Sequence, residues 1–473
     1  MSASSFRFYG FLSLLLILRI AFLAFTTLPL DCEEAQYWCW GAESISWGYF
    51  SKPPLTSWLM TLMTTVGNQS AFWVRCLSPV FHFGVAWVIY AWAVSETSKT
   101  KARLAALLYF TLPGTFFSSI LMTTDVPLLL MSSMSLLFIW KGIQKERLGY
   151  WMVAGVFLGL ALLSKYIAAF IPISLILYAS LYQRRLFKTA GLYCLLLAAF
   201  TVVLPHLIWQ VNHGFTTIAH TLNSNMVVNS YGTKLNFSAF FEYVIGQFAL
   251  FGPFLMGLLV TRAFWRPKTP FEKFNHCLIW PLFITMCLQG LQPKVNLNWG
   301  VLTVLGVVLL CAHVESETFL KRMIVTNTTL GFIGMGLLLN PEASMQLFGV
   351  KYKGLNHYQL LQKAQHYTDQ WCKPNQCHLI ADHRCVAALA RFYGNYASAH
   401  KWYRGVGGKD YFEWVSPYKE RNDGKRGLYA IVTQRPIDDF GQFDQLDSHQ
   451  KIDPNHTLYL VTSKPGFSGP EDS

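Results

Sequence analysis

Residues 11–30 read FLSLLLILRIAFLAFTTLPL, and the residues that follow, 31–41, read DCEEAQYWCWG. The first stretch is almost entirely apolar and is long enough to cross the hydrocarbon core of a bilayer as a helix. The second stretch brings three carboxylates and three aromatic side chains directly behind it. We therefore expect a membrane span that is followed at once by a polar segment at the membrane surface.

The composition of the whole chain is that of a membrane protein. Of its 473 residues, 53% are hydrophobic and only 13% are charged, and this charged share is about half that of soluble domains. The net charge of +13 comes without a zinc-finger spacing or an RNA-binding motif, and Lys and Arg of membrane proteins gather in cytoplasmic loops. These observations predict a polytopic membrane protein and no nucleic-acid partner.

Apolar runs recur along the first 340 residues and predict about eleven spans, the first being a retained helix and not a cleaved signal peptide. The predicted spans are 8–28, 71–94, 103–122, 126–140, 149–163, 167–182, 189–209, 243–261, 277–291, 298–313 and 323–340. With a cytoplasmic N-terminus, nearly every loop dense in Lys and Arg falls on one side, as the positive-inside rule requires. The first loop and the C-terminal part are then predicted to lie outside.

The composition changes after residue 342. Residues 343–473 carry many charges and short β-rich runs, which predict a small extracytoplasmic α/β domain after an all-α membrane domain at 1–342. If this domain lies outside, Cys372 and Cys377 are able to form a disulfide, and their spacing is not that of paired zinc ligands. The predicted strands are 378–382, 428–434 and 458–463, and the predicted helices are 356–371 and 384–393.

Carboxylates in the outer loops are candidates for chemistry. Asp31, Glu33 and Glu34 follow the first span, and Asp125 lies between two spans. A carboxylate in such a place is able to act as a general base or to bind a cation, and an acid beside apolar spans is costly unless it is solvated or paired. An alternative stays open for each group. The first-loop acids are alternatively solvated loop charges, and Asp125 alternatively caps the helix that begins at Val126.

Basic and imidazole side chains lie in the same outer loops. Lys52 precedes two prolines, which stiffen the backbone, and a fixed ammonium suits a phosphate group. Lys165 either snorkels to the interface or faces a polar cavity, and Lys294 marks another outer corner. The histidines of the loop after the seventh span show no HExxH or similar metal motif.

The order of these segments resembles the GT-C glycosyltransferases that use polyprenyl-phosphate sugars. That family includes bacterial relatives of the protein O-mannosyltransferases and the aminoarabinose transferases of lipid A. Each segment is weak alone, and their order makes the set specific. The segments are EEAQYWCWG (33–41), WGYFSKPPLTSW (47–58), TTDVPLLL (123–130), GLALLSKYIA (159–168), LIWQVNHGFTTIAHT (207–221), FEYVIGQFALFGPFL (241–255), KVNLNWGVL (294–302) and IADHRCVAALARFYG (380–394).

The resemblance implies a GT-C helical bundle with juxtamembrane helices in the first outer loop. It also implies a reaction in which an acceptor attacks the anomeric carbon of a sugar carried on a polyprenyl phosphate. The leaving phosphate needs positive partners, and a hydroxyl acceptor needs an acid residue as base. The implied phosphate-binding residues are Lys52, then Lys165 and Lys294. The implied catalytic acids are Glu33, then Glu34 and Asp31, with Asp125 at the family's second acidic position. The implied substrate-pocket residues are Tyr37, Trp38, Tyr49, His213, His220 and Asn298.

Two positions depart from the family pattern. Glu33 stands where relatives usually carry Asp, so the base is one methylene longer. Ser51 stands where some relatives carry an acid that helps to hold a divalent metal. No cofactor is therefore predicted with certainty, and metal dependence stays open.

The expected function is sugar transfer to lipid A or to another lipopolysaccharide or glycolipid group, on the outer face of a bacterial inner membrane. A protein O-glycosyltransferase is the enzyme alternative. A transporter or flippase for the lipid-linked sugar would show internal repeats and interrupted spans with midplane charges, and no such repeat is visible. An envelope scaffold would leave Asp125 and Lys52 without a role.

Overall fold

The structure of the protein is a computed structural model. The chain forms two compact units, which are described separately. Unit 1 comprises Met1–Thr26, Ser46–Leu59 and Phe72–Leu339, and unit 2 comprises Thr27–Ile45, Met60–Ala71 and Asn340–Ser473. The residues that the structure describes are 3–225, 235–261, 266–291, 295–349, 352–371, 377–381, 383–394, 396, 398–401, 428–433 and 443–463.

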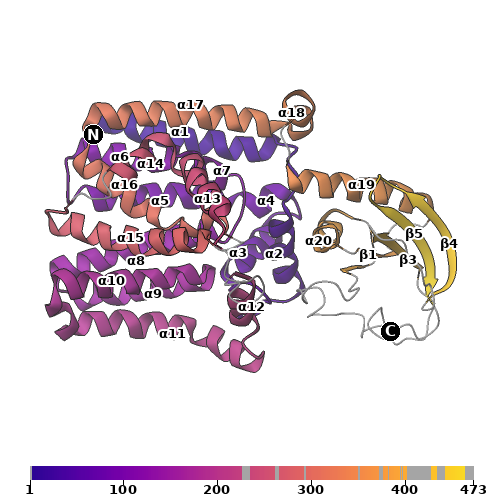
Figure 1. The fold of residues 1–473 in the computed structure, drawn as a ribbon, viewed down its shortest axis with the longest axis horizontal. Helices are drawn as coiled ribbons and strands as arrows, with labels where there is room; N and C mark the ends of the chain where they lie inside the picture. Colours follow the sequence, from indigo (N-terminus) through magenta and orange to yellow (C-terminus); the bar gives the residue numbers. More distant parts are fainter. Residues whose placement is uncertain are drawn as a thin grey trace. The chain divides into compact units, whose positions relative to one another are not determined.

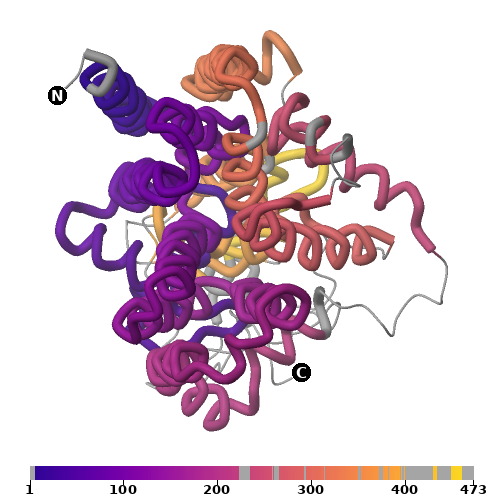
Figure 2. The backbone as a smooth tube through the Cα atoms, turned by 90° about the vertical axis from the view of Figure 1, so that its left-hand side faces the viewer, coloured from indigo at the N-terminus to yellow at the C-terminus, as the bar shows by residue number. Residues whose placement is uncertain are grey.

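Unit 1 is a bundle of α-helices. Its long helices run roughly side by side in Figure 1, and Figure 2 shows them nearly end-on. Its longer helices are α1 (Ala3–Phe25), α5 (Leu77–Ala93), α6 (Lys99–Thr111), α8 (Asp125–Lys145), α9 (Leu148–Ser164), α10 (Phe170–Tyr182), α11 (Ala190–Asn212), α12 (Thr216–Asn225), α13 (Phe237–Phe251), α15 (Pro270–Gly290), α16 (Thr303–Val314) and α17 (Glu317–Leu339). Shorter ones are α7 (Pro113–Ser118), α14 (Pro253–Thr261), η1 (Tyr166–Ala169), η2 (Arg184–Lys188) and η3 (Leu297–Gly300). Helices α3 (Leu55–Val66) and α4 (Ala71–Arg75) contribute residues to both units.

All of the predicted spans fall on helices, so the all-α membrane fold class is confirmed. Two of the runs are nevertheless interrupted at a proline or a glycine. The run 103–122 is broken between α6 and α7 by Pro113, because the residue before a proline is disfavoured in helical conformation. The run 243–261 is broken at Gly252, whose φ of 81° suits glycine. By length and composition, five described stretches are able to cross a membrane: Phe6–Phe25, Ala71–Ala93, Asp125–Lys145, Ala190–Asn212 and Glu317–Leu339.

Helices α8, α9 and α11 form the part of the bundle that carries the polar residues of interest. On α9, Gly155 and Gly159 face α11 so closely that an added Cβ at either glycine would overlap atoms of that helix. Small residues four apart let two helix backbones approach in this way. Helices α8 and α9 form an antiparallel hairpin, in which Ser135 donates a hydrogen bond to the carbonyl of Ala154. The start of α8 and the end of α9 therefore lie at the same end of the bundle.

Unit 2 contains the predicted α/β domain. Its five strands pair in the order β2-β1-β3-β5-β4, with β1 parallel to β2 and β3 and the other pairs antiparallel. The predicted strands and helices are present, but β2 and β4 were not predicted. The strands are β1 (Cys377–Ala381), β2 (Ser398–Lys401), β3 (Leu428–Thr433), β4 (Phe443–Lys451) and β5 (Thr457–Ser463). The helices are α18 (Pro341–Phe348), α19 (Lys353–Trp371) and α20 (Arg384–Tyr393).

Unit 2 also contains helix α2 (Cys32–Glu43) from the first loop, which packs against α20. A disulfide joins Cys32 to Cys385 across the two helices, and Arg391 of α20 forms an ion pair with Glu43. The predicted domain boundary after residue 342 lies near Asn340, where the last stretch of unit 2 begins, but first-loop segments in this unit were not expected. The predicted Cys372–Cys377 disulfide stays a prediction, because Cys372 lies outside the described residues.

Candidate active site

An ion pair in unit 1 joins two of the predicted site residues. Asp125 is the first residue of α8, and Lys165 follows the last residue of α9. The Nζ atom of Lys165 lies 2.7 Å from Oδ1 of Asp125, and the two side chains are only 14% and 6% exposed. The dipoles of the two helices favour an acid at a start and a cation at an end. The α8–α9 hairpin thus pairs an acid and a base at low exposure.

Asn298 contacts the same carboxylate. It lies in η3, and its Nδ2 donates a hydrogen bond to Oδ2 of Asp125. Both carboxylate oxygens therefore accept from a donor, which offsets the cost of removing this charge from water. Asp125 does not cap α8, because the N-cap of this helix is Thr124. The Thr124 side chain makes no cap hydrogen bond. Asp125 is instead held between α9 and η3.

A cavity of about 320 Å³ lies beside Asp125 and Asn298. Most of its lining is apolar and comes from several helices of unit 1; examples are Phe117, Leu250 and Val304. Its volume is at the lower end of ligand pockets, and a mostly apolar pocket with a few convergent polar groups is their usual form. The cavity therefore suits an apolar ligand that ends in a polar group.

The loop before Lys52 is fixed by α11 and α12. His206 donates from Nδ1 to the carbonyl of Trp47 at 2.6 Å, and Thr217 donates to the carbonyl of Tyr49. Between them, Gly48 lies so close to Trp209 that an added Cβ would overlap the indole ring. These contacts hold the backbone at 47–49, three residues before Lys52. They position the loop from which the predicted phosphate-binding ammonium extends.

The tautomer of His206 follows from its partners. Its Nδ1 donates to a carbonyl, so its Nε2 accepts from the Tyr166 hydroxyl, 2.8 Å away. Gln210 in turn donates to the oxygen of Tyr166 at 3.2 Å. Sequence reasoning assigned no role to His206, which lies near the end of the predicted span 189–209. The signal that would have found it is its spacing of four residues from Gln210 on one helix face.

The other predicted residues of unit 1 that the structure describes lie around this loop. Tyr49 is buried, and burial raises the pKa of its hydroxyl to about 12. His220 stacks at a tilt on Phe50, with ring centroids 4.8 Å apart. His213 is exposed and stacks on Trp209. Lys52 is half-buried, and Lys294 lies outside the described residues.

The first-loop acids in unit 2 take two structural roles. Asp31 is the N-cap of α2, and its side chain accepts from the backbone N–H groups of Glu33 and Glu34, while the Glu34 side chain accepts from the backbone N–H of Asp31 at 2.9 Å. This reciprocal pair is a capping box. Burial and the charge of Glu34 raise the pKa of Asp31. Glu33 is exposed, and its carboxylate accepts from the Tyr37 hydroxyl at 2.9 Å.

Two predicted pocket aromatics are part of the packing of unit 2. Tyr37 and Trp38 are both buried. The ring of Trp38 packs edge-on against Phe392, with centroids 4.8 Å apart, and its Nε1 donates to Thr64. These contacts of Trp38 are all within the protein.

The residues described around Asp125 do not make a metal site. Its carboxylate oxygens accept from Lys165 and Asn298. A metal cation bound to this carboxylate would be repelled by the ammonium of Lys165. Among the described residues, a group of three or more side chains with metal-ligating atoms close together occurs in unit 2, at His357, His383 and Cys385, and not here.

Sequence comparison relates the chain to sugar transferases. Residues 51–209 match the family described as dolichyl-phosphate-mannose-protein mannosyltransferase. The lipid A galacturonosyltransferase RgtD of Rhizobium johnstonii is 27% identical over 332 residues, which are 69% of this chain and 68% of that protein. The lipopolysaccharide core galacturonosyltransferase RgtB of the same organism is 22% identical over 225 residues, 45% of this chain and 44% of that protein.

Solved structures show the fold. ArnT from Cupriavidus metallidurans, bound to undecaprenyl phosphate, superposes with a TM-score of 0.66 at 12% identity, covering 98% of this chain and 99% of that one. The same protein in its apo state gives a TM-score of 0.65 at 14% identity, covering 99% of this chain and 100% of that one. The shared fold extends over the helical bundle and the C-terminal α/β domain alike.

Proposed function

We propose that this chain, a membrane glycosyltransferase of the GT-C type, moves a sugar from a polyprenyl-phosphate carrier to lipid A or a related lipopolysaccharide group. One observation carries the proposal: the Asp125–Lys165 pair and Asn298 form a polar corner on a largely apolar cavity. Such a cavity suits a lipid whose reacting end is polar. The lipid A acceptor is supported by the likeness to RgtD over two thirds of the chain.

The reaction makes one bond and breaks another. An acceptor oxygen attacks the anomeric carbon, the bond from that carbon to the phosphate oxygen breaks, and the lipid phosphate leaves with the electron pair. We assign Lys52 to the leaving phosphate, because the contacts at Trp47 and Tyr49 fix the loop before it. A positive group at the developing charge lowers the barrier.

Glu33 is assigned as the base that takes the proton of an acceptor hydroxyl. Asp31 and Glu34 are engaged with each other in the capping box, whereas Glu33 is the exposed acid of the three. A phosphate acceptor would be anionic already and would need no base. Lys165 is assigned to hold Asp125 in place, because its ammonium contacts that carboxylate.

We further propose that unit 2 lies on the outer face of the bacterial inner membrane. Structural disulfides are typical of oxidising compartments and rare in the cytosol, and unit 2 contains the Cys32–Cys385 disulfide. The distribution of Lys and Arg among the predicted loops supports the same orientation. The chain would then bind its donor lipid from the outer leaflet.

A protein acceptor is the second candidate. It is favoured by the match of residues 51–209 to a family whose description names a protein mannosyltransferase. One experiment separates the two. Membranes with and without the protein receive radiolabelled polyprenyl-phosphate sugars of several kinds, and the label in lipid A and in envelope proteins is counted. Label in lipid A supports the proposal, and label in envelope proteins alone favours the second candidate. If the chain adds no label to lipid A or to envelope proteins, both candidates are overturned.

A further inference from the structure

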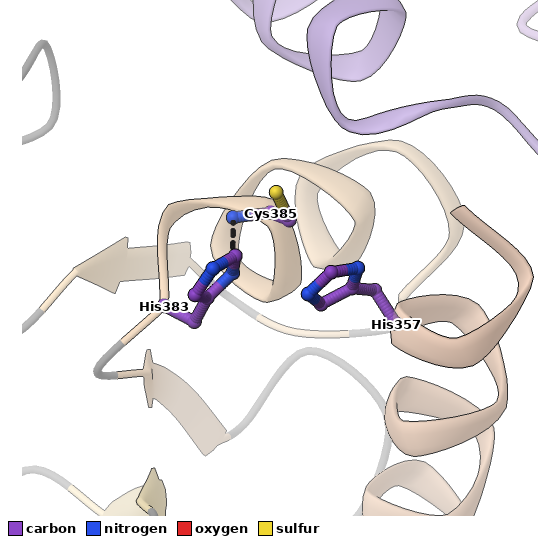
Figure 3. Close-up of side chains that lie close together, drawn as sticks. All are labelled: His357, His383 and Cys385. Atoms are coloured by element: carbon purple, nitrogen blue, oxygen red, sulfur yellow. Dashed lines mark hydrogen bonds between the residues drawn. The ribbon is translucent and has the colours of Figure 1, made fainter. Parts of the chain in front are cut away.

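Four side chains with metal-ligating atoms come together at one place in unit 2. Two are imidazoles, from α19 and from the residue before α20, and two are the disulfide-bonded cysteines at the starts of α2 and α20. We call them the Cys2His2 cluster: Cys32, His357, His383 and Cys385. Figure 3 shows the two rings facing each other beside the first turn of α20. Their centroids are 4.6 Å apart.

The distances within the cluster are close to those of a bound metal. One ligand atom each from His357, His383 and Cys385 lie within 4.8 Å of one another, and the sulfur of Cys32 is bonded to that of Cys385. Four ligands around a zinc ion at about 2.0–2.3 Å lie roughly 3.3–3.8 Å apart. The ligand atoms of His357, His383 and Cys385 therefore exceed the spacing of zinc ligands by roughly 1–1.5 Å at most. Opening the disulfide frees the sulfur of Cys32 to move away from that of Cys385.

Both cysteines lie in the first turn of a helix. Cys32 is the first residue of α2, and Cys385 is the second residue of α20. A cysteine binds a metal as its thiolate. Two thiolates and two imidazoles are the ligand set of structural zinc sites.

We propose that the reduced form of this cluster binds Zn²⁺, as an alternative to the disulfide. A dithiol reductant converts the disulfide to two thiols and is itself oxidised to its own disulfide. Zn²⁺ then displaces two protons from the thiols and is bound by two thiolates and two neutral imidazoles. The sulfur atoms cannot form the S–S bond and bind the ion as thiolates at once, so the two states exclude each other. Either state joins α2 to α20.

Metal binding would give up one hydrogen bond. His383 is the N-cap of α20, and its Nδ1 accepts from the backbone N–H of Cys385 at 3.3 Å. If Nδ1 binds the metal, its lone pair is taken. If Nε2 binds, the proton moves to Nδ1, which then donates and no longer accepts. Losing this cap costs far less than the binding energy that a structural zinc site supplies.

The test uses the full chain in detergent and Co²⁺ as a probe that reports its ligands. The protein is reduced with a phosphine and titrated with Co²⁺, and a parallel sample is left oxidised. We expect one equivalent of Co²⁺ with a thiolate-to-cobalt absorption band and the visible bands of tetrahedral geometry in the reduced sample alone. Added Zn²⁺ should displace this signal and should slow reoxidation of the two thiols.

Variants assign the ligands. His383→Asn removes a ligand while keeping a good N-cap, and His357→Ala removes the ligand on α19. Each should weaken Co²⁺ binding by about two orders of magnitude. The matched control is His366→Ala, an exposed histidine on the same helix, which should bind like wild type. His357→Gln replaces His357→Ala if the latter does not fold. Equal binding by oxidised and reduced protein, or wild-type affinity in both ligand variants, would overturn the proposal.

Discussion

Lys165 and Asp125 neutralise each other at the ends of two adjacent helices, with 2.7 Å between ammonium and carboxylate. Removing one partner leaves the other charge at low exposure without its counterion, whereas removing both leaves none. We expect Lys165→Met and Asp125→Asn to destabilise the protein by up to about 3 kcal/mol each. The double variant should be less destabilised than the sum of the two. Thermal unfolding in detergent measures this, and additive effects would show that the pair is not coupled.

Substitutions of Lys165 and Lys52 are expected to affect catalysis differently. Lys165 is assigned a positioning role, so in Lys165→Met the transfer rate should fall while the apparent KM for the donor changes little. In Lys52→Met the apparent KM for the donor should rise and the transfer rate should fall, because Lys52 is assigned to the phosphate itself. The measurement is transfer from radiolabelled donor at several donor concentrations. The opposite pattern would assign the phosphate to Lys165.

Glu33 and Glu34 differ in structure although they are neighbours in sequence. Glu33→Gln should lower transfer to a hydroxyl acceptor by about 10²–10⁴-fold, which is the usual worth of a general base. Glu34→Gln is the matched control, because glutamine also serves in a capping box, and it should keep most of the activity. Both are assayed in membranes at equal protein levels. Equal loss in the two variants would mean that Glu33 is not the base.

Gly48 has no room for a side chain because of Trp209. In Gly48→Ala the indole or the loop has to move, which lowers the free energy of unfolding by about 1–3 kcal/mol. The loop then no longer holds Lys52 in its position. Transfer should fall, and Gly48→Ala combined with Trp209→Leu should recover part of it. Melting temperature and transfer rate are measured for wild type, for Gly48→Ala and for the double variant. Full activity in Gly48→Ala would show that the loop position is unimportant.

The pKa of Asp31 is raised by burial and by Glu34, which makes its charged form unfavourable in the folded state. Its contribution to stability is therefore fully present below the unfolded pKa of about 3.9 and is lost as pH rises through the folded pKa. Asp31→Asn keeps an N-cap residue and has no carboxyl to ionise. Its melting temperature relative to wild type should rise between pH 4 and pH 7. A difference that does not change with pH would contradict this.

Much of the bundle was predictable because the signal is local. A run of apolar residues marks a span wherever it occurs, and Asp125, Lys165 and Asn298 stood out as polar residues next to such runs. Their meeting was not predictable, since it depends on the α8–α9 hairpin and on where η3 packs. The breaks at Pro113 and Gly252 were missed because apolar character continues across both.

In unit 2, by contrast, the local sequence indicates less of the structure. Strand β4 reads FDQLDSHQK, with no β-branched residue, so its sequence does not indicate a strand, and β2 has only four residues. The pairing of α2 with α20 depends on Cys32 and Cys385, which are 353 residues apart. Sequence reasoning instead considered a pair five residues apart, at Cys372 and Cys377. Local spacing carries no information about a contact of such long range.

That separation has a consequence for the order of synthesis. The thiol of Cys32 emerges early, but its partner is added only after 353 further residues, which takes roughly 20–70 seconds at bacterial elongation rates of 5–20 residues per second. Throughout that interval the first loop has no covalent anchor, and Cys39 lies seven residues away as a wrong partner. A nascent chain that stops before residue 385 can make all its long apolar helices and still leave this loop unsecured. Maturation of the loop therefore waits until the start of α20 in the α/β domain has been translated.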